Sequence, residues 1–453
     1  MRGYLSSSAG VVCATALALP LTLPTTPASA VARPAGARAA TAAPAAPAVP
    51  GATQSLPLTP RPGDRTLGPA AEQGLYRPDV RHFSLVGVIW DNPDTELCGR
   101  VEVRTRAARD GRWSGWQDVE THNHEHAADP DSAESASGRV RGSTAPLWVG
   151  DSNGVEVRVR AEGAGRALDA GAPLPSGLRL ELVDPGAAPA VPGRQGARAL
   201  EPAETDPSTE PPESEPESEP ESEPASEPES QSDPAPEPAA ANADLAQRGV
   251  KPFIGARPKI ITRRGWGADE SLRERGFVYT KTVKAAFVHH TASGNKYWCS
   301  QVPSVIRGIY RYHVLSSGWR DIGYNFLVDR CGNIYEGRAG GMTKPVRGAH
   351  TLGFNTNSMG IAVIGTFTNS KPSRNAVKAI ARLTAWKLGL YGVNPNGKTY
   401  LTSGGGNLYR KGKNVRLNVI SGHRDGFATE CPGRLLYGQL GTARKTAATY
   451  QGR

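Results

Sequence analysis

The chain has 453 residues, more than one ordinary domain needs, which indicates two or three domains. Aromatic residues make up only 6% of it and are unevenly placed, and Ala, Gly and Pro are abundant, which indicates folded segments separated by disordered ones. The net charge of +10 conceals a division, because residues 251–453 contain 32 Lys and Arg against 8 Asp and Glu. Residues 251–453 therefore carry a net charge of +24 and the rest of the chain −14. We expect a polyanionic partner for this basic part; the alternative is that its charge serves solubility alone.

The N-terminal residues have the order of a secretory signal. Arg2 precedes an apolar run over residues 11–21, and residues 28–30, Ala-Ser-Ala, have the small-x-small form of a cleavage site. We predict a signal peptide over residues 1–30 and a secreted protein, extracellular or associated with the cell wall. The run is too short to span a membrane and no later run qualifies, so no membrane span is expected.

The next three regions differ sharply in composition. Residues 31–74 are rich in Ala, Pro and Thr without an apolar period, which predicts a disordered leader. Residues 75–186 contain short runs that alternate with period two, which predicts a small antiparallel β-domain, most simply a sandwich. Residues 187–250 repeat Glu-Ser-Glu-Pro and have almost nothing to bury, so they are predicted to be a disordered acidic linker.

Three histidines alternate inside the β-rich region. His122, His124 and His126 would share one face of a strand and could bind a metal there. Their acidic neighbours instead favour a solvated polar loop, which is the interpretation we prefer.

Residues 257–453 mix strand and helix patterns. An apolar run at 285–288 leads into His289, and a run at 359–365 that is apolar on both faces predicts a central strand. Ser373 can cap an amphipathic helix, and a final helix is expected after Pro432. Together with a hairpin near residues 324–336, these elements predict an α/β domain with a mixed central sheet flanked by helices.

Two short stretches of this domain offer metal ligands. Adjacent residues on a strand point to opposite faces, so only one of His289 and His290 can join a given site. His423 follows an apolar strand, and Cys431 lies at the predicted start of a helix, where a thiolate is favoured. Two imidazoles and one thiolate leave one position of zinc open, which is the catalytic pattern. The spacing equally fits packed histidines and a disulfide-bonded Cys431.

Motifs throughout residues 257–445 resemble the peptidoglycan recognition protein and type 2 N-acetylmuramoyl-L-alanine amidase family, in the order that the family has them. The stretches that carry the resemblance are RGWGA at 264–268, FVHHTA at 287–292, DIGYNFLV at 321–328, IYEGR at 334–338, GAH at 348–350, NSMGI at 357–361, GHRD at 422–425 and TECPG at 429–433. The β-rich region resembles an accessory region found before such domains.

The resemblance implies a site and a reaction. It assigns a Zn²⁺ ion to His289, His423 and Cys431, and catalytic roles to Tyr324 and Thr429. The implied reaction is hydrolysis of the amide between N-acetylmuramic acid and L-alanine in peptidoglycan. The intact ligand set argues against the alternative, a protein that recognises peptidoglycan with little or no catalysis.

Other residues receive more general expectations. Arg338 and Asn355 are candidate substrate contacts, and His350 is expected to have either a substrate or a structural role. His313 is predicted to be a core histidine, and His290 to be packed near the site. Relatives carry cysteines at the positions of Cys299 and Cys331, so the resemblance implies that these two residues form a disulfide, which leaves Cys98 odd.

The expected partners are therefore peptidoglycan or muropeptides, together with anionic wall polymers that suit the basic domain. No nucleic-acid-binding motif is present, so no nucleic acid is expected, and we expect a monomer.

Overall fold

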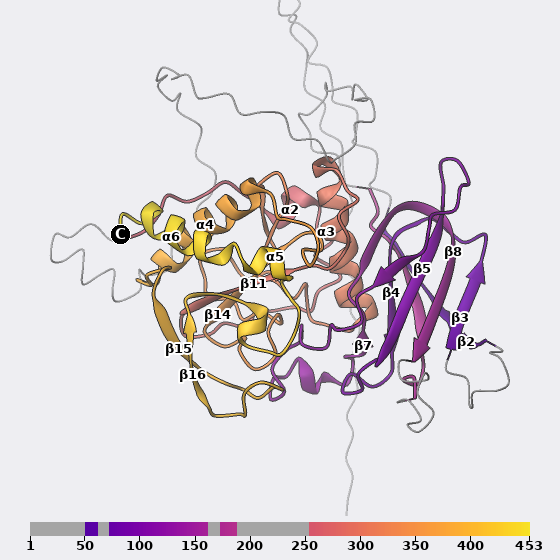
Figure 1. The fold of residues 1–453 in the computed structure, drawn as a ribbon, viewed down its shortest axis with the longest axis horizontal. Helices are drawn as coiled ribbons and strands as arrows, with labels where there is room; N and C mark the ends of the chain where they lie inside the picture. The colour runs from indigo at the N-terminus through magenta and orange to yellow at the C-terminus, as the bar shows by residue number, and fades with distance from the viewer. Residues whose placement is uncertain (1–49, 62–71, 162–172, 188–252) are drawn as a thin grey trace, which may run out of the picture. The chain divides into compact units, whose positions relative to one another are not determined.

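The computed structural model describes residues 50–61, 72–161, 173–187 and 253–453. They form an all-β body followed along the chain by an α/β body (Figure 1). The predicted signal peptide, part of the predicted leader and nearly all of the acidic linker lie outside the described residues. No helix among the described residues is long and apolar enough to cross a membrane.

The all-β body is a single antiparallel network of nine strands. The main path runs β1-β9-β4-β8-β3-β2, and the long strand β8 also pairs with β5. The strands are β1 Ala52–Pro57, β2 Thr59–Pro60, β3 Glu72–Arg77, β4 Phe83–Trp90, β5 Gly99–Ala107, β6 Gln117–Val119, β7 Gly142–Ser143, β8 Leu147–Ala161 and β9 Arg179–Asp184.

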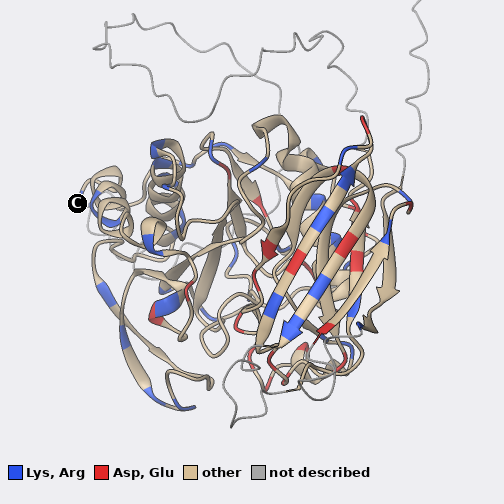
Figure 2. Cartoon of the chain, turned by 45° about the vertical axis from the view of Figure 1, so that its right-hand side comes forward, with Lys and Arg blue, Asp and Glu red and all other residues tan. Residues whose placement is uncertain are grey.

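Period-two alternation sets the two faces of β5 and β8. Their valines, such as Val103 and Val157, are buried in one core, while charged side chains face outward. Figure 2 shows Lys or Arg and Asp or Glu alternating along these strands. Glu156 accepts from Arg104 Nε at 2.7 Å and from Arg61 Nη2 at 3.0 Å, so ion pairs join neighbouring strands on the outer face.

The predicted start of the β-domain at residue 75 is wrong. β1 and β2 lie inside the predicted leader, and β1 pairs with β9 from Ala52↔Asp184 to Pro57↔Arg179. A short edge strand rich in Thr and Pro has little apolar pattern of its own and is specified by its partner strand. The described part of the linker, residue 187, adds no element.

The α/β body is built on a six-stranded mixed sheet of order β10-β13-β12-β14-β11-β17. Only β12 and β13 are antiparallel neighbours; the others pair in parallel. The strands are β10 Ile260–Ile261, β11 Ala285–His290, β12 Phe326–Val328, β13 Ile334–Glu336, β14 Ser358–Val363 and β17 Ile420–Gly422, with a separate hairpin of β15 Lys398–Thr402 and β16 Asn414–Asn418.

Helices cover both faces of this sheet, as predicted. α4 (Arg374–Gly389) and α6 (Leu440–Tyr450) pack on one face, and α3 (Val302–Arg311) packs on the other. The Ser373 hydroxyl accepts from the Ala376 N–H at 3.1 Å and caps α4. The remaining short helices are α2 Arg263–Trp266, η1 Ser135–Ser137, η2 Cys299–Gln301, η3 Tyr312–Ser316, η4 His423–Asp425 and α5 Arg434–Tyr437. The single helix predicted after Pro432 is two, α5 and α6.

The two bodies share a hydrophobic core where α3 and η3 meet β4 and β9. A Cβ atom on Gly87 would lie 2.4 Å from the Tyr312 ring, so β4 can approach η3 this closely only with glycine. The buried Tyr312 hydroxyl donates to the Thr144 carbonyl at 3.1 Å. The connection from β6 to β7, residues 120–141, is also held against the α/β body, because the Leu352 N–H donates to the Glu125 carbonyl at 2.9 Å and the Arg141 N–H donates to the Ser317 carbonyl at 3.1 Å.

A disulfide joins Cys299, in η2, to Cys331, in the turn between β12 and β13. This is the pairing that the resemblance implied. Cys98 is free and exposed, and Cys431 is free and buried.

Candidate metal centre

The sheet brings its two histidine-bearing segments together. β11 ends in His289 and His290 and is flanked by β14 and β17. β17 runs parallel to β11 and leads directly into His423 at the start of η4. Because parallel neighbours end at one edge of a sheet, His289 and His423 lie together, with ring centroids 4.5 Å apart.

Cys431 completes this group from the loop before α5. Its Sγ lies 3.8 Å from Nδ1 of His289. The three residues that the resemblance assigned to a metal are thus neighbours, and all are buried.

A fourth residue joins them from the all-β body. Nε2 of His126 lies 3.5 Å from Sγ of Cys431, and its ring centroid lies 4.5 Å from that of His423. One ligand atom from each of His126, His289, His423 and Cys431 can be chosen so that all lie within 4.8 Å of one another.

The preferred interpretation of the three alternating histidines as a solvated loop is wrong for His126. Its exposed fraction is 5%, whereas the side chain of His122 is 72% exposed. The sequence pointed to a metal-binding alternative for these histidines, but it could not select His126. That selection depends on how residues 120–141 pack on the α/β body, whose described residues begin at 253.

The donor set fits a metal ion such as zinc. Neither ring nitrogen of His423 has a well-aligned hydrogen-bond partner among the described residues, although both are buried. Burial lowers the pKa of His126, His289 and His423 well below the usual value, which keeps the imidazoles neutral and able to coordinate. Unpaired buried nitrogens beside a buried sulfur are the arrangement that a cation would satisfy.

The predicted reason for a thiolate at Cys431 is wrong. α5 begins at Arg434, beyond Pro432, and burial raises the pKa of Cys431 well above its usual value. A bound cation, and not a helix terminus, is what would stabilise the thiolate here.

His350 supports His289 from behind. Nδ1 of His350 lies 3.3 Å from Nε2 of His289, which leaves Nδ1 of His289 facing Cys431. His350 is fully buried, and its backbone N–H donates to Oδ1 of Asn355 at 2.7 Å. Of the two roles left open by the sequence, the geometry favours positioning of His289.

The other two histidines are packed away from the donor set. Nδ1 of His290 accepts from the Phe367 N–H at 3.3 Å on the opposite face of β11. Nδ1 of His313 accepts from the Gly323 N–H at 3.3 Å, and its ring centroid lies 4.3 Å from that of Trp319.

Tyr324 and Thr429 border the centre. The buried ring of Tyr324 lies 5.6 Å from that of His289 and 6.0 Å from that of His126. The Thr429 hydroxyl donates to Glu125 Oε1 at 2.7 Å and accepts from the Cys431 N–H at 3.1 Å. A small cavity is lined by residues of both bodies: Glu120, His122, Asn123, His126, Ala145, His290, Thr291, Ala292, Tyr324, Thr429, Glu430 and Cys431.

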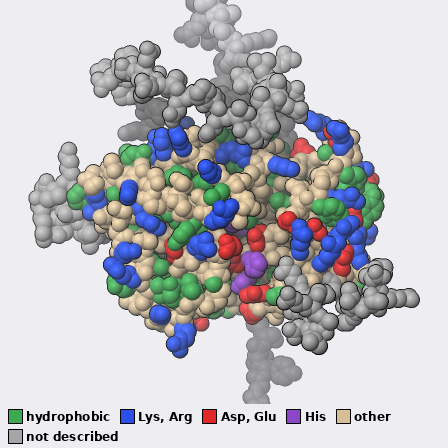
Figure 3. Space-filling view, viewed as in Figure 1, with side chains coloured by type: hydrophobic (Ala, Val, Ile, Leu, Met, Phe, Trp, Pro, Cys, Tyr) green, Lys and Arg blue, Asp and Glu red, His purple; other side chains and the backbone are tan. Residues whose placement is uncertain are grey.

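The predicted substrate contacts are occupied by carboxylates of the all-β body. Arg338 makes a two-pronged ion pair with Glu134, at 2.8 and 2.9 Å. The Asn355 amide donates to Asp129 at 2.8 Å. On one face of the molecule, histidine and acidic side chains gather side by side (Figure 3).

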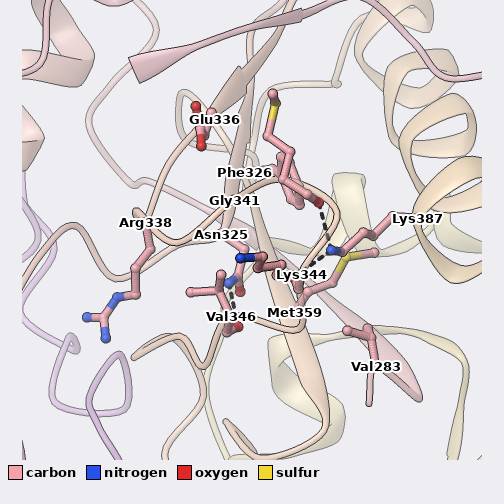
Figure 4. Close-up of a pocket in the computed structure, with 11 residues that line it drawn as sticks. Val283, Asn325, Phe326, Glu336, Arg338, Gly341, Lys344, Val346, Met359 and Lys387 are labelled. Atoms are coloured by element: carbon pink, nitrogen blue, oxygen red, sulfur yellow. Dashed lines mark hydrogen bonds between the residues drawn. The ribbon is translucent and has the colours of Figure 1, made fainter. Parts of the chain in front are cut away.

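A second pocket lies next to Arg338 but does not reach the metal centre. Figure 4 shows the Arg338 guanidinium pointing away from Lys387, whose ammonium donates to the carbonyls of Met342 and Lys344, both at 2.7 Å. Apolar side chains such as Val283 and Met359 and the polar side chains of Asn325 and Glu336 also line it.

Both bodies match known protein families. Residues 279–434 match the family described as N-acetylmuramoyl-L-alanine amidase, and residues 39–219 match a family described as Rv3811 N-terminal galactose-binding domain-like. Peptidoglycan-recognition protein SC2 of Drosophila simulans is 33% identical over 187 residues, which cover 40% of this chain and 85% of the relative. Peptidoglycan-recognition protein 1 of Holotrichia diomphalia is 33% identical over 186 residues, covering 40% and 79%.

Among solved structures, one similar chain is that of peptidoglycan recognition protein-LE in complex with tracheal cytotoxin, a monomeric diaminopimelic acid-type peptidoglycan. It is 32% identical, with a TM-score of 0.33, and the match covers 40% of this chain and 92% of that one.

Proposed function

The chain belongs to the family of peptidoglycan-recognition proteins and N-acetylmuramoyl-L-alanine amidases, and from this premise we propose that it is a secreted zinc-dependent amidase of peptidoglycan. The bond cleaved is the amide between the lactyl group of N-acetylmuramic acid and L-alanine of the stem peptide. The observation that carries the proposal is the meeting of His289, His423 and Cys431 beside Tyr324.

Zinc bound by these residues would supply Lewis-acid polarisation of the lactyl carbonyl and would lower the pKa of water. His289, His423 and Cys431 would hold the ion, and His350 would keep His289 turned toward Cys431.

The remaining residues would act on the substrate directly. The Tyr324 hydroxyl, which burial keeps protonated by raising its pKa well above the usual value, can donate to the oxygen that gains negative charge. The Thr429 hydroxyl can donate to the same oxygen once Glu125 no longer accepts from it. No covalent intermediate is needed, so no nucleophilic side chain is required.

The charge of the α/β body supports a cell-wall partner. A net charge of +24 over residues 251–453 attracts anionic wall polymers and the carboxylates of stem peptides.

Purified peptidoglycan incubated with the zinc-loaded protein tests this function. Mass spectrometry should find free stem peptides with an L-alanine amino terminus, and Cys431→Ser should abolish their release. Because His126 lies against the site, the assay includes the full chain and its His126→Ala variant. If both bind peptidoglycan and release nothing at full zinc occupancy, the chain is a recognition protein and the proposal is wrong.

A further inference from the structure

We propose that residues 120–141 are an intramolecular cover of the metal centre, in which His126 is a fourth protein ligand and nearby carboxylates occupy the substrate contacts. The structure would then be that of a latent form of the protein. The inference rests on the proposed function in one respect: the site that residues 120–141 cover is taken to be the active site of the amidase. The family site needs His289, His423 and Cys431 alone, so His126 is an addition specific to this architecture.

The position of His126 is the first argument. Nε2 points at Sγ of Cys431 from 3.5 Å, while Nδ1 is buried without a hydrogen-bond partner among the described residues. Nε2 is therefore the nitrogen on the side of the donor set, and a metal ion held jointly with Sγ of Cys431 would bind it.

The number of donors is the second argument. Three protein ligands leave a zinc position open for water or substrate, whereas four close the tetrahedron. His126, His289, His423 and Cys431 make a set of three imidazoles and one thiolate, all buried. With His126 in place, the centre has the closed pattern of a structural site.

The carboxylates of the cover are the third argument. Glu125 accepts from Thr429, and Glu134 from Arg338. Asp129 accepts from Asn355 at 2.8 Å and from Arg347 at 2.7 Å. An acidic segment thus sits on a basic body, in the places where carboxylates of an anionic substrate would bind.

The composition of the cover allows it to leave. Every side chain buried between residues 120 and 141 is polar; they are Asn123, Glu125, His126, Asp129, Ser132 and Glu134. Buried ion pairs contribute little net stability because desolvation offsets their attraction. Displacement would therefore expose no buried apolar side chain of the cover itself, and residues 120–141 contribute no side chain to the hydrophobic clusters of the described residues.

The test compares the zinc-loaded full chain with His126→Ala and with His122→Ala, a matched control on the same segment whose side chain is exposed. X-ray absorption at the zinc edge should count three imidazoles and one sulfur in the wild type and in His122→Ala. It should count two imidazoles, one sulfur and an oxygen donor in His126→Ala. Transfer of zinc to a chelator should be faster in His126→Ala, on the order of tenfold or more.

A measurement on the unaltered chain complements the variants. Adding zinc to the metal-free protein should slow amide hydrogen exchange across residues 123–134, because His126 ties the cover to the ion. The proposal is overturned if only two imidazoles coordinate zinc in the wild type, if the coordination is the same in His126→Ala, and if zinc does not change the rate of amide hydrogen exchange.

Failure of the function and failure of the cover are separable. If coordination changes in His126→Ala but no form releases stem peptides, the amidase proposal is wrong and His126 is still a fourth ligand. If the wild type and His126→Ala release equal amounts and coordination is unchanged, the amidase proposal holds and the cover proposal is wrong. If both proposals hold, release by His126→Ala exceeds that by the wild type.

Discussion

Arg338 and Glu134, which are 204 residues apart in sequence, face each other with their guanidinium and carboxylate planes joined by two hydrogen bonds, 2.8 and 2.9 Å long. The side chains of both are less than a tenth exposed. This pair ties residues 120–141 to the α/β body at a point away from the metal centre. Burial raises the pKa of Glu134, but Arg338 outweighs that effect and the net pKa is below the usual value.

Glu134→Gln should be strongly destabilising as long as the cover stays docked, by about 3 kcal/mol, because it leaves the buried Arg338 charge without a partner. Urea unfolding measures the loss, and hydrogen exchange over residues 120–141 shows whether the cover is released instead. Asp131→Asn is the matched control, since Asp131 pairs with Lys411 on the surface, where both side chains are about two-thirds exposed. That substitution should cost less than about 1 kcal/mol. Equal costs for the two variants would contradict the buried role of Arg338 and Glu134.

Lys387 should make stability rise with pH. Burial lowers its pKa to about 7, whereas the unfolded chain keeps the ordinary value of about 10.5. Between these values the unfolded state binds more protons than the folded state, so the free energy of unfolding increases as pH rises from about 7 to about 10. The gain is at most about 1.4 kcal/mol per pH unit. Urea unfolding at several pH values measures it, and Lys387→Met should flatten the curve; an unchanged slope in that variant would refute the assignment.

The three family ligands illustrate what local sequence can specify. His289 and His423 each follow an apolar run, and two such runs become parallel neighbours in an α/β sheet. Their convergence follows from that topology. Alternation along a strand excludes one of His289 and His290 from the site, and the resemblance selects His289. Cys431 is a candidate from its residue type and place in the sequence, Tyr324 is added by the resemblance, and both lie at the centre.

His126 shows what local sequence cannot specify. Residues 120–141 have few apolar side chains and many charges, which is the composition of a solvated loop. Two of their buried carboxylates, those of Glu134 and Asp129, pair with Arg338 and Asn355, more than 200 residues later. Burial of a charged segment depends on those distant partners, and no short-range pattern records them. The edge strand β1, which is paired with β9, escaped prediction for the same reason.

His350→Ala should weaken zinc binding by about 10-fold to 100-fold, because His289 would lose the contact that orients it. Competition with a chromophoric chelator measures the affinity. His350→Asn keeps a polar atom near the position of Nδ1 and should lose less. A purely structural role would lower the stability of the metal-free protein in both variants and leave this difference absent.

The disulfide between Cys299 and Cys331 should stabilise the α/β body by about 3 to 4 kcal/mol, because it closes a loop with a sequence separation of 32. The double variant Cys299→Ala/Cys331→Ala should lose that amount in urea unfolding under oxidising conditions. Cys98→Ser, which removes an exposed free thiol, should be neutral. A reducing agent should destabilise the wild type and leave the double variant unchanged; equal sensitivity of both would contradict the prediction.

Tyr324→Phe should separate catalysis from binding. The variant removes only a hydroxyl from a buried ring beside His289, so zinc content and peptidoglycan binding should persist. Loss of one donor to developing negative charge costs on the order of 100-fold or more in turnover. The comparison is best made in the His126→Ala background, where the centre is uncovered, by counting released stem peptides. Tyr400→Phe, on an exposed strand of the β15–β16 hairpin, is the control and should retain full release. Undiminished release by Tyr324→Phe would show that the hydroxyl has no part in the reaction and that the ion and its ligands suffice.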